Sequence, residues 1–227
     1  MATRSAAGLT RPPVARLLSR LQPPSPPPFA AFSRSAAAEG RAILSTEAGR
    51  FLEALAVCRP DGKILELGCG TGGATYWLAK GASRASIVAA DRALERLNRA
   101  RALLGESGLG ANVEWFHGDA RDVLESVTAP LDLVVIEVGA DVGADEARRL
   151  VDLTLPKLAV GGRIAVLGAL RDLVDDGLAA VEVAALERLR PYLLIHPQLA
   201  SSIVPIGEGV LLSVKRRETI RELGGPF

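Results

Sequence analysis

Apolar and polar positions alternate in blocks from residue 39 onward. Five short apolar runs predict strands at 63–67, 86–90, 112–116, 131–137 and 163–168. Helical spacing of apolar residues predicts helices between them, at about 73–81, 93–105, 120–127, 143–156 and 174–190. The strand runs are apolar nearly throughout, as expected for a parallel sheet covered on both faces. The pattern predicts an α/β fold with a doubly wound, mostly parallel sheet.

The end of the chain follows a different pattern. "PYLLIHPQL" and "GVLLSVKR" predict two further strands, which would bring the sheet to seven. The connecting segment "ASSIVPIGE" is too short to hold a crossover helix, so the two strands are expected to pair antiparallel. A dinucleotide-binding sheet is usually parallel to its end. The antiparallel pair therefore favours a different Rossmann-like fold.

The first 38 residues have a composition of their own. They hold half of the 14 prolines and no acidic residue before Glu39. "PVARLLSRL" predicts an amphipathic helix, and "PPSPPP" an extended linker. We expect a cap helix and proline-rich linker over residues 1–38 and one folded domain over 39–227. An Arg- and Ser-rich start without acidic residues is also typical of organelle transit peptides, and that alternative stays open.

Charge and cysteine content narrow the function classes. The chain of 227 residues has a net charge of +1, which gives no global field to attract nucleic acid or an anionic membrane. No apolar run reaches the roughly 18 residues that cross a bilayer. Cys58 and Cys69 are expected to be reduced thiols, because a disulfide at Cys69 would distort the glycine loop around it. We therefore expect a cytoplasmic protein that binds neither nucleic acid nor membrane.

The glycine-rich segment "LELGCGTGG" permits two interpretations. Gly68, Gly70 and Gly73 match the G-x-G-x-x-G pattern of dinucleotide sites. Gly68, Gly70 and Gly72, preceded by Glu66, also match a pattern typical of S-adenosylmethionine sites. A carboxylate at Glu66 would repel a pyrophosphate and attract the ammonium group of a methionine moiety. Glu66 therefore favours S-adenosylmethionine.

Two later positions support the same cofactor. Asp91 ends the second predicted strand, where its carboxylate can accept hydrogen bonds from both ribose hydroxyls, and Arg92 follows it as a further cofactor contact. In "HGDARDVL", Asp119 is expected to bind the exocyclic amine of adenine, with the backbone of Ala120 at the ring edge. No Tyr-x-x-x-Lys pair follows the cofactor-binding half of the chain to support the competing hypothesis of an NAD-dependent oxidoreductase.

The ordered set of these motifs resembles class I S-adenosylmethionine-dependent methyltransferases, and within them the O-methyltransferase family of the caffeoyl-CoA and catechol enzymes. The resemblance spans about residues 45–216 and includes "STEAGRFLEALA", "LPKLAVGGRIAVL" and the family-specific "VPIGEGVLLSVK". It implies a homodimer whose N-terminal segments lie near the substrate mouth. Where the family has Gly-Tyr-Ser-Thr after the loop, this chain has "GGAT", so Thr75 or Thr71 is expected to supply the hydroxyl near the cofactor.

The chain departs from this family at the metal site. The resemblance implies ligands in an Asp-Ala-Asp-Lys stretch after strand four and an Asp-Asn pair after strand five, which hold a divalent cation. This chain has "EVGA" at 137–140 and Leu167-Gly168 at those places. One carboxylate, Glu137, does not suffice to hold Mg²⁺. We therefore predict no catalytic metal.

Few side chains remain as candidates for a general base. Glu137 ends strand four beside the expected methyl group, and Asp141 follows it in the loop. His117 and His196 are interpreted as structural or surface residues. The leading hypothesis is metal-independent O-methylation of a small-molecule acceptor, with Glu137 or Asp141 as catalytic residue. The alternative is a non-catalytic homologue that binds the cofactor or a protein partner.

Overall fold

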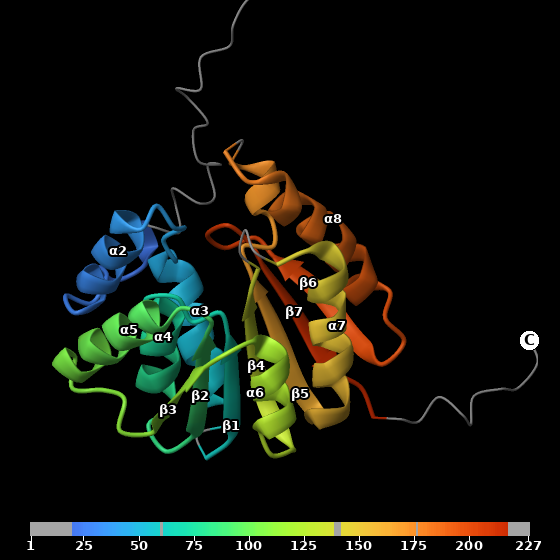
Figure 1. The fold of residues 1–227 in the computed structure, drawn as a ribbon, viewed down its shortest axis with the longest axis horizontal. Helices are drawn as coiled ribbons and strands as arrows, with labels where there is room; N and C mark the ends of the chain where they lie inside the picture. The colour runs from blue at the N-terminus through green and yellow to red at the C-terminus, as the bar shows by residue number, and fades with distance from the viewer. Residues whose placement is uncertain (1–19, 60, 139–141, 176, 218–227) are drawn as a thin grey trace, which may run out of the picture.

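A mixed sheet of seven strands forms the centre of the protein (Figure 1). The computed structural model describes residues 20–59, 61–138, 142–175 and 177–217. The strands are β1 Lys63–Leu67, β2 Ser86–Asp91, β3 Val113–His117, β4 Leu131–Glu137, β5 Leu158–Leu167, β6 Leu199–Val204 and β7 Val210–Lys215. Their order across the sheet is β3-β2-β1-β4-β5-β7-β6, with parallel pairing from β3 to β5. The predicted doubly wound α/β fold is confirmed.

The helices cover both faces of this sheet. They are α2 Phe29–Ala38, α3 Thr46–Val57, α4 Gly73–Gly81, α5 Leu94–Glu106, α6 Ala120–Ser126, α7 Ala144–Thr154 and α8 Ala180–Leu194, with short 3-10 turns η1 Leu155–Lys157 and η2 Arg171–Leu173. In Figure 1, α2, α4 and α5 lie to the left of the central strands, and α7 and α8 to the right. None of the helices in the described ranges is long and apolar enough to cross a membrane.

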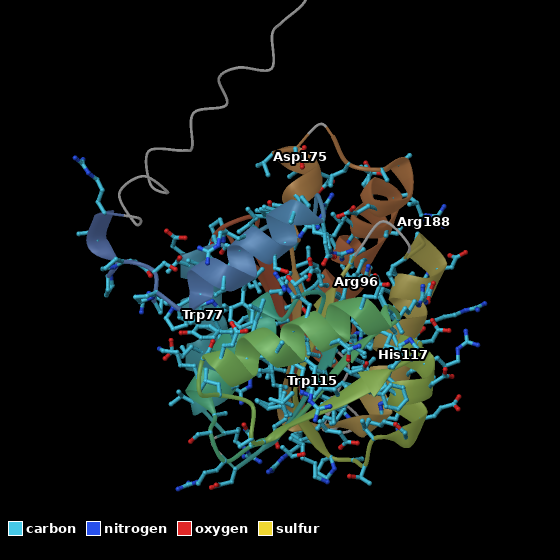
Figure 2. The ribbon with its side chains drawn as sticks, turned by 60° about the vertical axis from the view of Figure 1, so that its left-hand side comes forward. Trp77, Arg96, Trp115, His117, Asp175 and Arg188 are labelled. Atoms are coloured by element: carbon cyan, nitrogen blue, oxygen red, sulfur yellow. The ribbon has the colours of Figure 1, made fainter. Side chains whose placement is uncertain are left out.

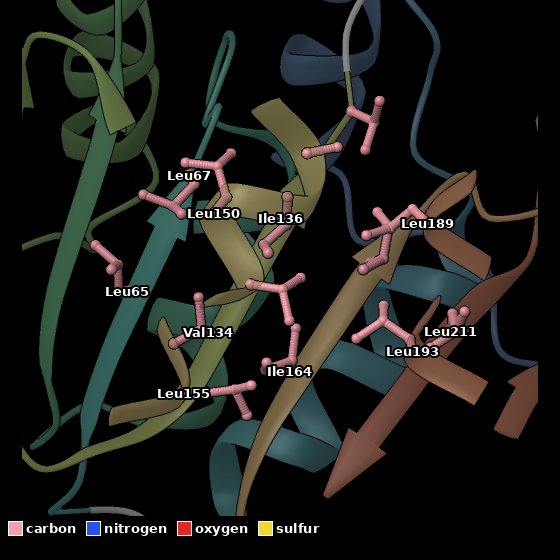
Figure 3. Packing of buried hydrophobic residues seen from close by; sticks show 14 of the residues in the cluster. Leu65, Leu67, Val134, Ile136, Leu150, Leu155, Ile164, Leu189, Leu193 and Leu211 are labelled. Carbon is pink, nitrogen blue, oxygen red and sulfur yellow. The ribbon is translucent and has the colours of Figure 1, made fainter. Parts of the chain in front are cut away.

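Alternation along the central strands divides the core in two. Leu65 and Leu67 of β1 point to the α6–α8 side and pack with Val134 and Ile136 of β4 (Figure 3). Ile64, one position out of phase, packs on the opposite side with residues of α3 and α4. Successive strand side chains point to opposite faces, so a strand buried on both sides must be apolar at nearly every position. Glu66 is the exception within β1, and it lies on the α3–α4 side.

The antiparallel end of the sheet is confirmed, but the expected bounds of its first strand were wrong. β7 pairs antiparallel with both β5 and β6. The first four residues of "PYLLIHPQL" are the end of α8, and β6 is "LASSIV" instead. Leu186, Leu189 and Leu193 continue one buried helical stripe, which carries the helix through Pro191. That helical spacing outweighed the strand-like composition of the segment.

Helix α2 lies within residues 1–38 and was not expected from the sequence. Its Phe29 and Phe32 are 2% and 1% exposed and pack against Tyr76 and Trp77 of α4. Trp77, labelled in Figure 2, is covered by this contact. The segment 29–38 is therefore part of the folded core. Of the predicted helix "PVARLLSRL", all but the last two residues lie outside the described residues.

The proline-rich segment before α2 is anchored to α3. Arg50 donates hydrogen bonds to the backbone oxygens of Pro23 and Pro24, at 3.3 and 3.1 Å. No helix or strand forms between Pro23 and Pro28, as the sequence predicts. The two anchors bring α2 over the N-terminal end of α4, next to the glycine loop. Residues early in the chain therefore lie at the carboxyl ends of the strands, where open α/β sheets bind ligands.

Candidate functional site

The glycine loop connects β1 to α4 in a conformation that requires glycine. Gly68, Gly70 and Gly72 have φ angles of +83°, +54° and +88°, which residues with a Cβ rarely adopt. A Cβ on Gly68 would lie 3.2 Å from the backbone oxygen of Glu137, and one on Gly72 would lie 2.9 Å from the Cβ of Ala100. The loop therefore exposes bare backbone to any ligand above it.

Glu66 lies below this loop as a buried carboxyl. It is 2% exposed and accepts a hydrogen bond from Thr75 Oγ1 at 2.6 Å. Burial raises the pKa of Glu66 to about 8, against the lowering effect of the Thr75 hydrogen bond. At neutral pH the unliganded protein holds Glu66 mainly in its neutral form. Thr75, predicted as a cofactor contact, fixes this carboxyl to α4.

Asp91 connects β2 to the same loop. Its Oδ2 accepts a hydrogen bond from the backbone N–H of Gly70 at 2.9 Å. Its Oδ1 accepts from the backbone N–H of Ala93 at 2.8 Å and from the guanidinium of Arg96 at 2.7 Å. Figure 2 labels Arg96 on α5. Asp91 therefore fixes the loop position, and a carboxylate with two oxygens retains lone pairs for a further donor.

Two adjoining cavities open at the carboxyl ends of the strands. The β2-side cavity is lined by, among others, Gly68, Asp91, Arg92, Ala120, Ile136 and Val142. The β5-side cavity is lined by, among others, Phe29, Phe32, Thr71, Leu167, Gly168 and Arg171. Arg41 and Glu137 line both of them. These two side chains therefore stand at the junction of the cavities.

Arg92 connects three elements at the rim of the β2-side cavity. It forms ion pairs with Asp119, the residue before α6, and with Glu146 in the first turn of α7. The Asp119 side chain is 56% exposed. Asp119 does not line the two cavities, whereas Ala120 lines the β2-side cavity. Its predicted contact with adenine stays a prediction.

Glu137 ends β4 with its carboxyl at the junction. Burial raises the pKa of Glu137, while the positive charges of Arg171 and Arg41 lower it. The backbone N–H of Arg41 donates to the backbone oxygen of Ala36, whereas its guanidinium makes no hydrogen bond or ion pair with another described residue. A carboxylate with a raised pKa that faces a cavity is suited to accept a proton from a ligand.

Arg171 fills the space next to Gly168 at the end of β5. Its Nε lies 2.7 Å from Glu208 Oε2, its Nη1 lies 2.7 Å from Glu182 Oε1, and its Nη2 lies 3.7 Å from Glu137 Oε1. Burial favours the neutral guanidine, but the carboxylates of Glu208 and Glu137 outweigh it and raise the pKa of Arg171. A Cβ on Gly168 would lie only 2.7 Å from Arg171 Nη2. The guanidinium thus occupies the room that a larger side chain at 168 would need.

Most of the predicted site residues come together at this edge of the sheet. The predicted residues that line one or both cavities are Gly68, Gly70, Thr71, Asp91, Arg92, Ala120 and Glu137. Gly72, Glu66 and Thr75 support the loop from below. Asp141 lies outside the described residues, so its catalytic role stays a prediction.

The two histidines lie in other surroundings. His117 Nε2 lies 3.0 Å from the backbone oxygen of Arg92, and His196 stacks edge-on against Tyr192. Figure 2 labels His117 on β3. Both cysteines are free, with Cys69 buried in the loop and Cys58 exposed.

Sequence reasoning missed four polar residues around the cavities: Arg41, Arg96, Arg171 and Glu208. None of them belongs to a motif that marks it out. Glu208 lies inside the quoted "VPIGEG" segment, but its partner Arg171 is 37 positions earlier in the chain. Only the folded sheet brings the ends of β5 and of the β6–β7 connection together.

The site residues are compatible with a nucleoside cofactor that carries an amino-acid moiety. Bare backbone at three glycines admits a close ligand, and Asp91 presents an acceptor to the β2-side cavity. Ile136, Val142 and Leu150 give that cavity an apolar wall suited to a base. The adjoining β5-side cavity shares Arg41 and Glu137 with it.

Comparison with known proteins agrees with this geometry. Residues 64–162 match the family model described as a methyltransferase domain. A catechol O-methyltransferase of Mycobacterium tuberculosis is 35% identical over 111 residues, which cover 48% of this chain and 50% of that protein.

Two solved structures are similar over nearly their whole length. The cofactor-bound protein Rv0187 from MTB has 26% identity and a TM-score of 0.76, covering 92% of this chain and 100% of that one. The O-methyltransferase from Bacillus cereus, solved in complex with SAH, has 22% identity and a TM-score of 0.73, covering 89% and 97%. At that identity the second likeness supports the fold alone.

Proposed function

We propose that the chain is a class I S-adenosylmethionine-dependent O-methyltransferase that methylates a hydroxyl oxygen of a small molecule without a divalent metal. The main support for the proposal is Glu137, a half-buried carboxyl at the junction of two cavities. One cavity suits the nucleoside part of the cofactor and the other suits the acceptor.

We assign cofactor binding to the glycine loop and the β2-side cavity next to it. Gly68 and Gly70 present their backbone, and Asp91 would accept hydrogen bonds from the ribose. Arg92 and Ala120 would border the base. Bound there, S-adenosylmethionine supplies an electrophilic methyl group that replaces the hydroxyl proton of the acceptor. Glu66 would gain its charge when the ammonium group arrives, because a nearby cation lowers the pKa of a buried carboxyl.

Glu137 is proposed as the base. It takes the proton from the acceptor hydroxyl, and the raised pKa of this carboxyl helps it to hold that proton. The walls of the β5-side cavity orient the acceptor oxygen toward the junction, since reaction requires the reacting atoms to lie about 3–3.5 Å apart. The proton passes to solvent when the product leaves.

The residues at the end of β5 support the proposal that the reaction needs no metal. Leu167 and Gly168 offer no oxygen ligand from their side chains, and the Arg171 guanidinium lies directly against Gly168. A cation at that point would have to approach a fixed positive charge. Glu137 is then the carboxyl that remains for proton transfer.

Assembly and location are proposed on the family resemblance. We expect a cytoplasmic homodimer that does not bind nucleic acid, in keeping with a net charge of +1. Light scattering coupled to size exclusion tests the dimer directly. A monomer at micromolar concentration would contradict it without affecting the proposed chemistry.

The activity is tested with a panel of phenols, catechols and carboxylic acids. Each is incubated with S-adenosylmethionine, and methylated product is detected by mass spectrometry. We expect methyl ether from at least one hydroxyl acceptor, and none from the Glu137→Gln variant. Binding of S-adenosylhomocysteine without any product would support the non-catalytic alternative. Absence of binding at millimolar ligand would contradict the proposal as a whole.

A further inference from the structure

Arg171 is held in the β5-side cavity by bonds that fix its orientation. Its Nε donates to Glu208 and its Nη1 donates to Glu182, both at 2.7 Å. The guanidinium is planar, so two bonds from different nitrogens fix the whole group, including the third nitrogen. Arg171 is 7% exposed. Its remaining nitrogen, Nη2, is therefore preorganised.

Nη2 is the end of the guanidinium that the protein leaves available. Within the described residues it makes no hydrogen bond, and Glu137 Oε1 lies 3.7 Å away from it. That distance is too long for a direct hydrogen bond. The guanidinium packs directly against Gly168, where a Cβ would lie only 2.7 Å from Nη2. Both Arg171 and Glu137 line the same cavity.

The 3.7 Å separation leaves a position for one oxygen atom between the two groups. An oxygen about 2.8 Å from both atoms is geometrically possible, and the two hydrogen bonds then meet at it at an angle of about 80°. Such an oxygen must accept from Nη2 and donate to the Glu137 carboxylate. A hydroxyl does both, whereas a carboxylate or an ether can only accept and an ammonium can only donate.

Part of the wall of this cavity is aromatic. Phe29 and Phe32 of α2 line the β5-side cavity, and Leu167 adds an aliphatic surface. An acceptor that places one hydroxyl between Arg171 and Glu137 can lay an apolar ring against this wall. Aromatic rings gain from such contacts beyond the area they bury.

We propose that Arg171 and Glu137 together bind a single phenolic hydroxyl, with Arg171 Nη2 as its hydrogen-bond donor and Glu137 as its acceptor. The proposal rests on the proposed function and adds the substrate class, a phenol with one reacting hydroxyl and no need for a neighbouring one. As Glu137 takes the proton, the fixed guanidinium stabilises the negative charge on the oxygen. Arg171 is then a catalytic residue.

Binding of a coloured phenol provides the test. The protein is saturated with S-adenosylhomocysteine and titrated with 4-nitrophenol or with 4-nitroanisole, its methyl ether, at a pH of about 6. We expect 4-nitrophenol to bind at least tenfold more tightly, because only the phenol can donate to Glu137. Equal affinities, or no binding of 4-nitrophenol at millimolar concentration, would overturn the proposal.

The variant Arg171→Lys separates recognition from packing. It keeps the charge but loses the planar fork, so we expect 4-nitrophenol to bind at least tenfold more weakly while 4-nitroanisole changes less than threefold. The matched control is Arg190→Lys, because Arg190 is also paired with a carboxylate, Asp172, but does not line the cavity. The control is expected to bind both probes like the wild type. Unchanged 4-nitrophenol binding by Arg171→Lys would contradict the role of Nη2.

A second variant covers the case in which Arg171→Lys does not fold. Gly168→Ala puts a methyl group against Arg171 Nη2 and leaves every charge in place. We expect the same selective loss of 4-nitrophenol binding, and an equal loss for both probes would overturn the proposal. Calorimetry with S-adenosylhomocysteine alone reports on the proposed function separately, so failure there is distinguished from failure of the phenol site.

Discussion

The two sides of the site use different parts of the chain: backbone on the β2 side and charged side chains on the β5 side. The β2 side is a run of backbone: three glycines at positive φ, with Asp91 fixing the loop through the N–H of Gly70. The β5 side is a network of long charged side chains, in which Arg171 contacts carboxylates from β4, α8 and the β6–β7 connection. A backbone site can be specified by a short motif, whereas a side-chain network depends on segments far apart in the chain.

Because of this difference, the two sides of the site respond differently to substitutions. On the β2 side, a Cβ at Gly68 or Gly72 would lie 3.2 or 2.9 Å from its nearest neighbour, and a side chain at Gly70 would require a strained positive φ. On the β5 side, removal of one group leaves several buried charges without a partner. Substitutions on one side should therefore leave the properties of the other side unchanged.

Arg171→Met is expected to be the most disruptive change. It leaves Glu182 and Glu208 without their buried partner, and breaking a buried ion pair costs about 3–5 kcal/mol of unfolding free energy. Urea denaturation measures the change. The control is Arg84→Met, which removes an exposed pair with Asp61 and is expected to leave the midpoint unchanged. Equal midpoints for the two variants would contradict the buried network.

Glu137→Gln is expected to separate chemistry from cofactor binding. Loss of a general base lowers kcat by about 100-fold or more, while the dissociation constant for S-adenosylhomocysteine stays within about threefold. Initial rates with the best phenol of the panel, and calorimetry with the cofactor product, measure the two quantities. If kcat and the affinity for S-adenosylhomocysteine both fell by the same factor, Glu137 would belong to the cofactor side instead.

Asp91→Asn is expected to affect the β2 side alone. The amide keeps one acceptor oxygen but turns an N–H₂ toward donors, so cofactor affinity falls by about tenfold, or about 1.4 kcal/mol. Calorimetry checks the value. Asp132→Asn is the matched control, since Asp132 also accepts a backbone hydrogen bond, from Lys63 at 2.9 Å, and does not line the two cavities. A similar loss in the control would refute the specific role of Asp91.

Glu66→Gln is expected to have the smallest effect, and one that depends on pH. Burial raises the pKa of Glu66 to about 8 in the folded protein, above its ordinary value of 4.5. The folded state therefore holds a proton that the unfolded state releases, and wild-type stability falls as the pH rises from about 4.5 to 8.

The glutamine has no proton to lose and keeps its shape beside Thr75. Thermal unfolding of the unliganded protein should give similar stabilities at pH 5, and an advantage for Glu66→Gln of about 1 kcal/mol or more at pH 8. Curves that run parallel over this range would show that Glu66 is ionised in the fold.

The fold was largely predictable because its signals are local. β1, β4 and α4 have the expected bounds, since their apolar runs end at glycine or at a charged residue. The sixth strand was misplaced because leucines and a proline after a helix resemble a strand in composition. Helix α2 was missed because its "FAAFSRSAAA" follows five prolines and has only two large apolar residues.

The site was predictable only in part, for the same physical reason. Glu66, Gly68, Gly70, Gly72 and Asp91 form local patterns with a fixed spacing from a strand end. The sequence shows that Leu167-Gly168 replaces the Asp-Asn pair of the family. It does not show that the Arg171 guanidinium occupies the space beside Gly168. Arg171 reaches its partners through the antiparallel return of β7, so no spacing along the chain indicates the contact.

The central claim is that a protein side chain, rather than a metal ion, stands beside the acceptor oxygen. The most direct measurement is the initial rate of methyl transfer to one phenol in excess EDTA, compared with the rate after Mg²⁺ is added. Equal rates, within the error of the assay, are the predicted result. A reaction that stops in EDTA and returns with Mg²⁺ would contradict the account.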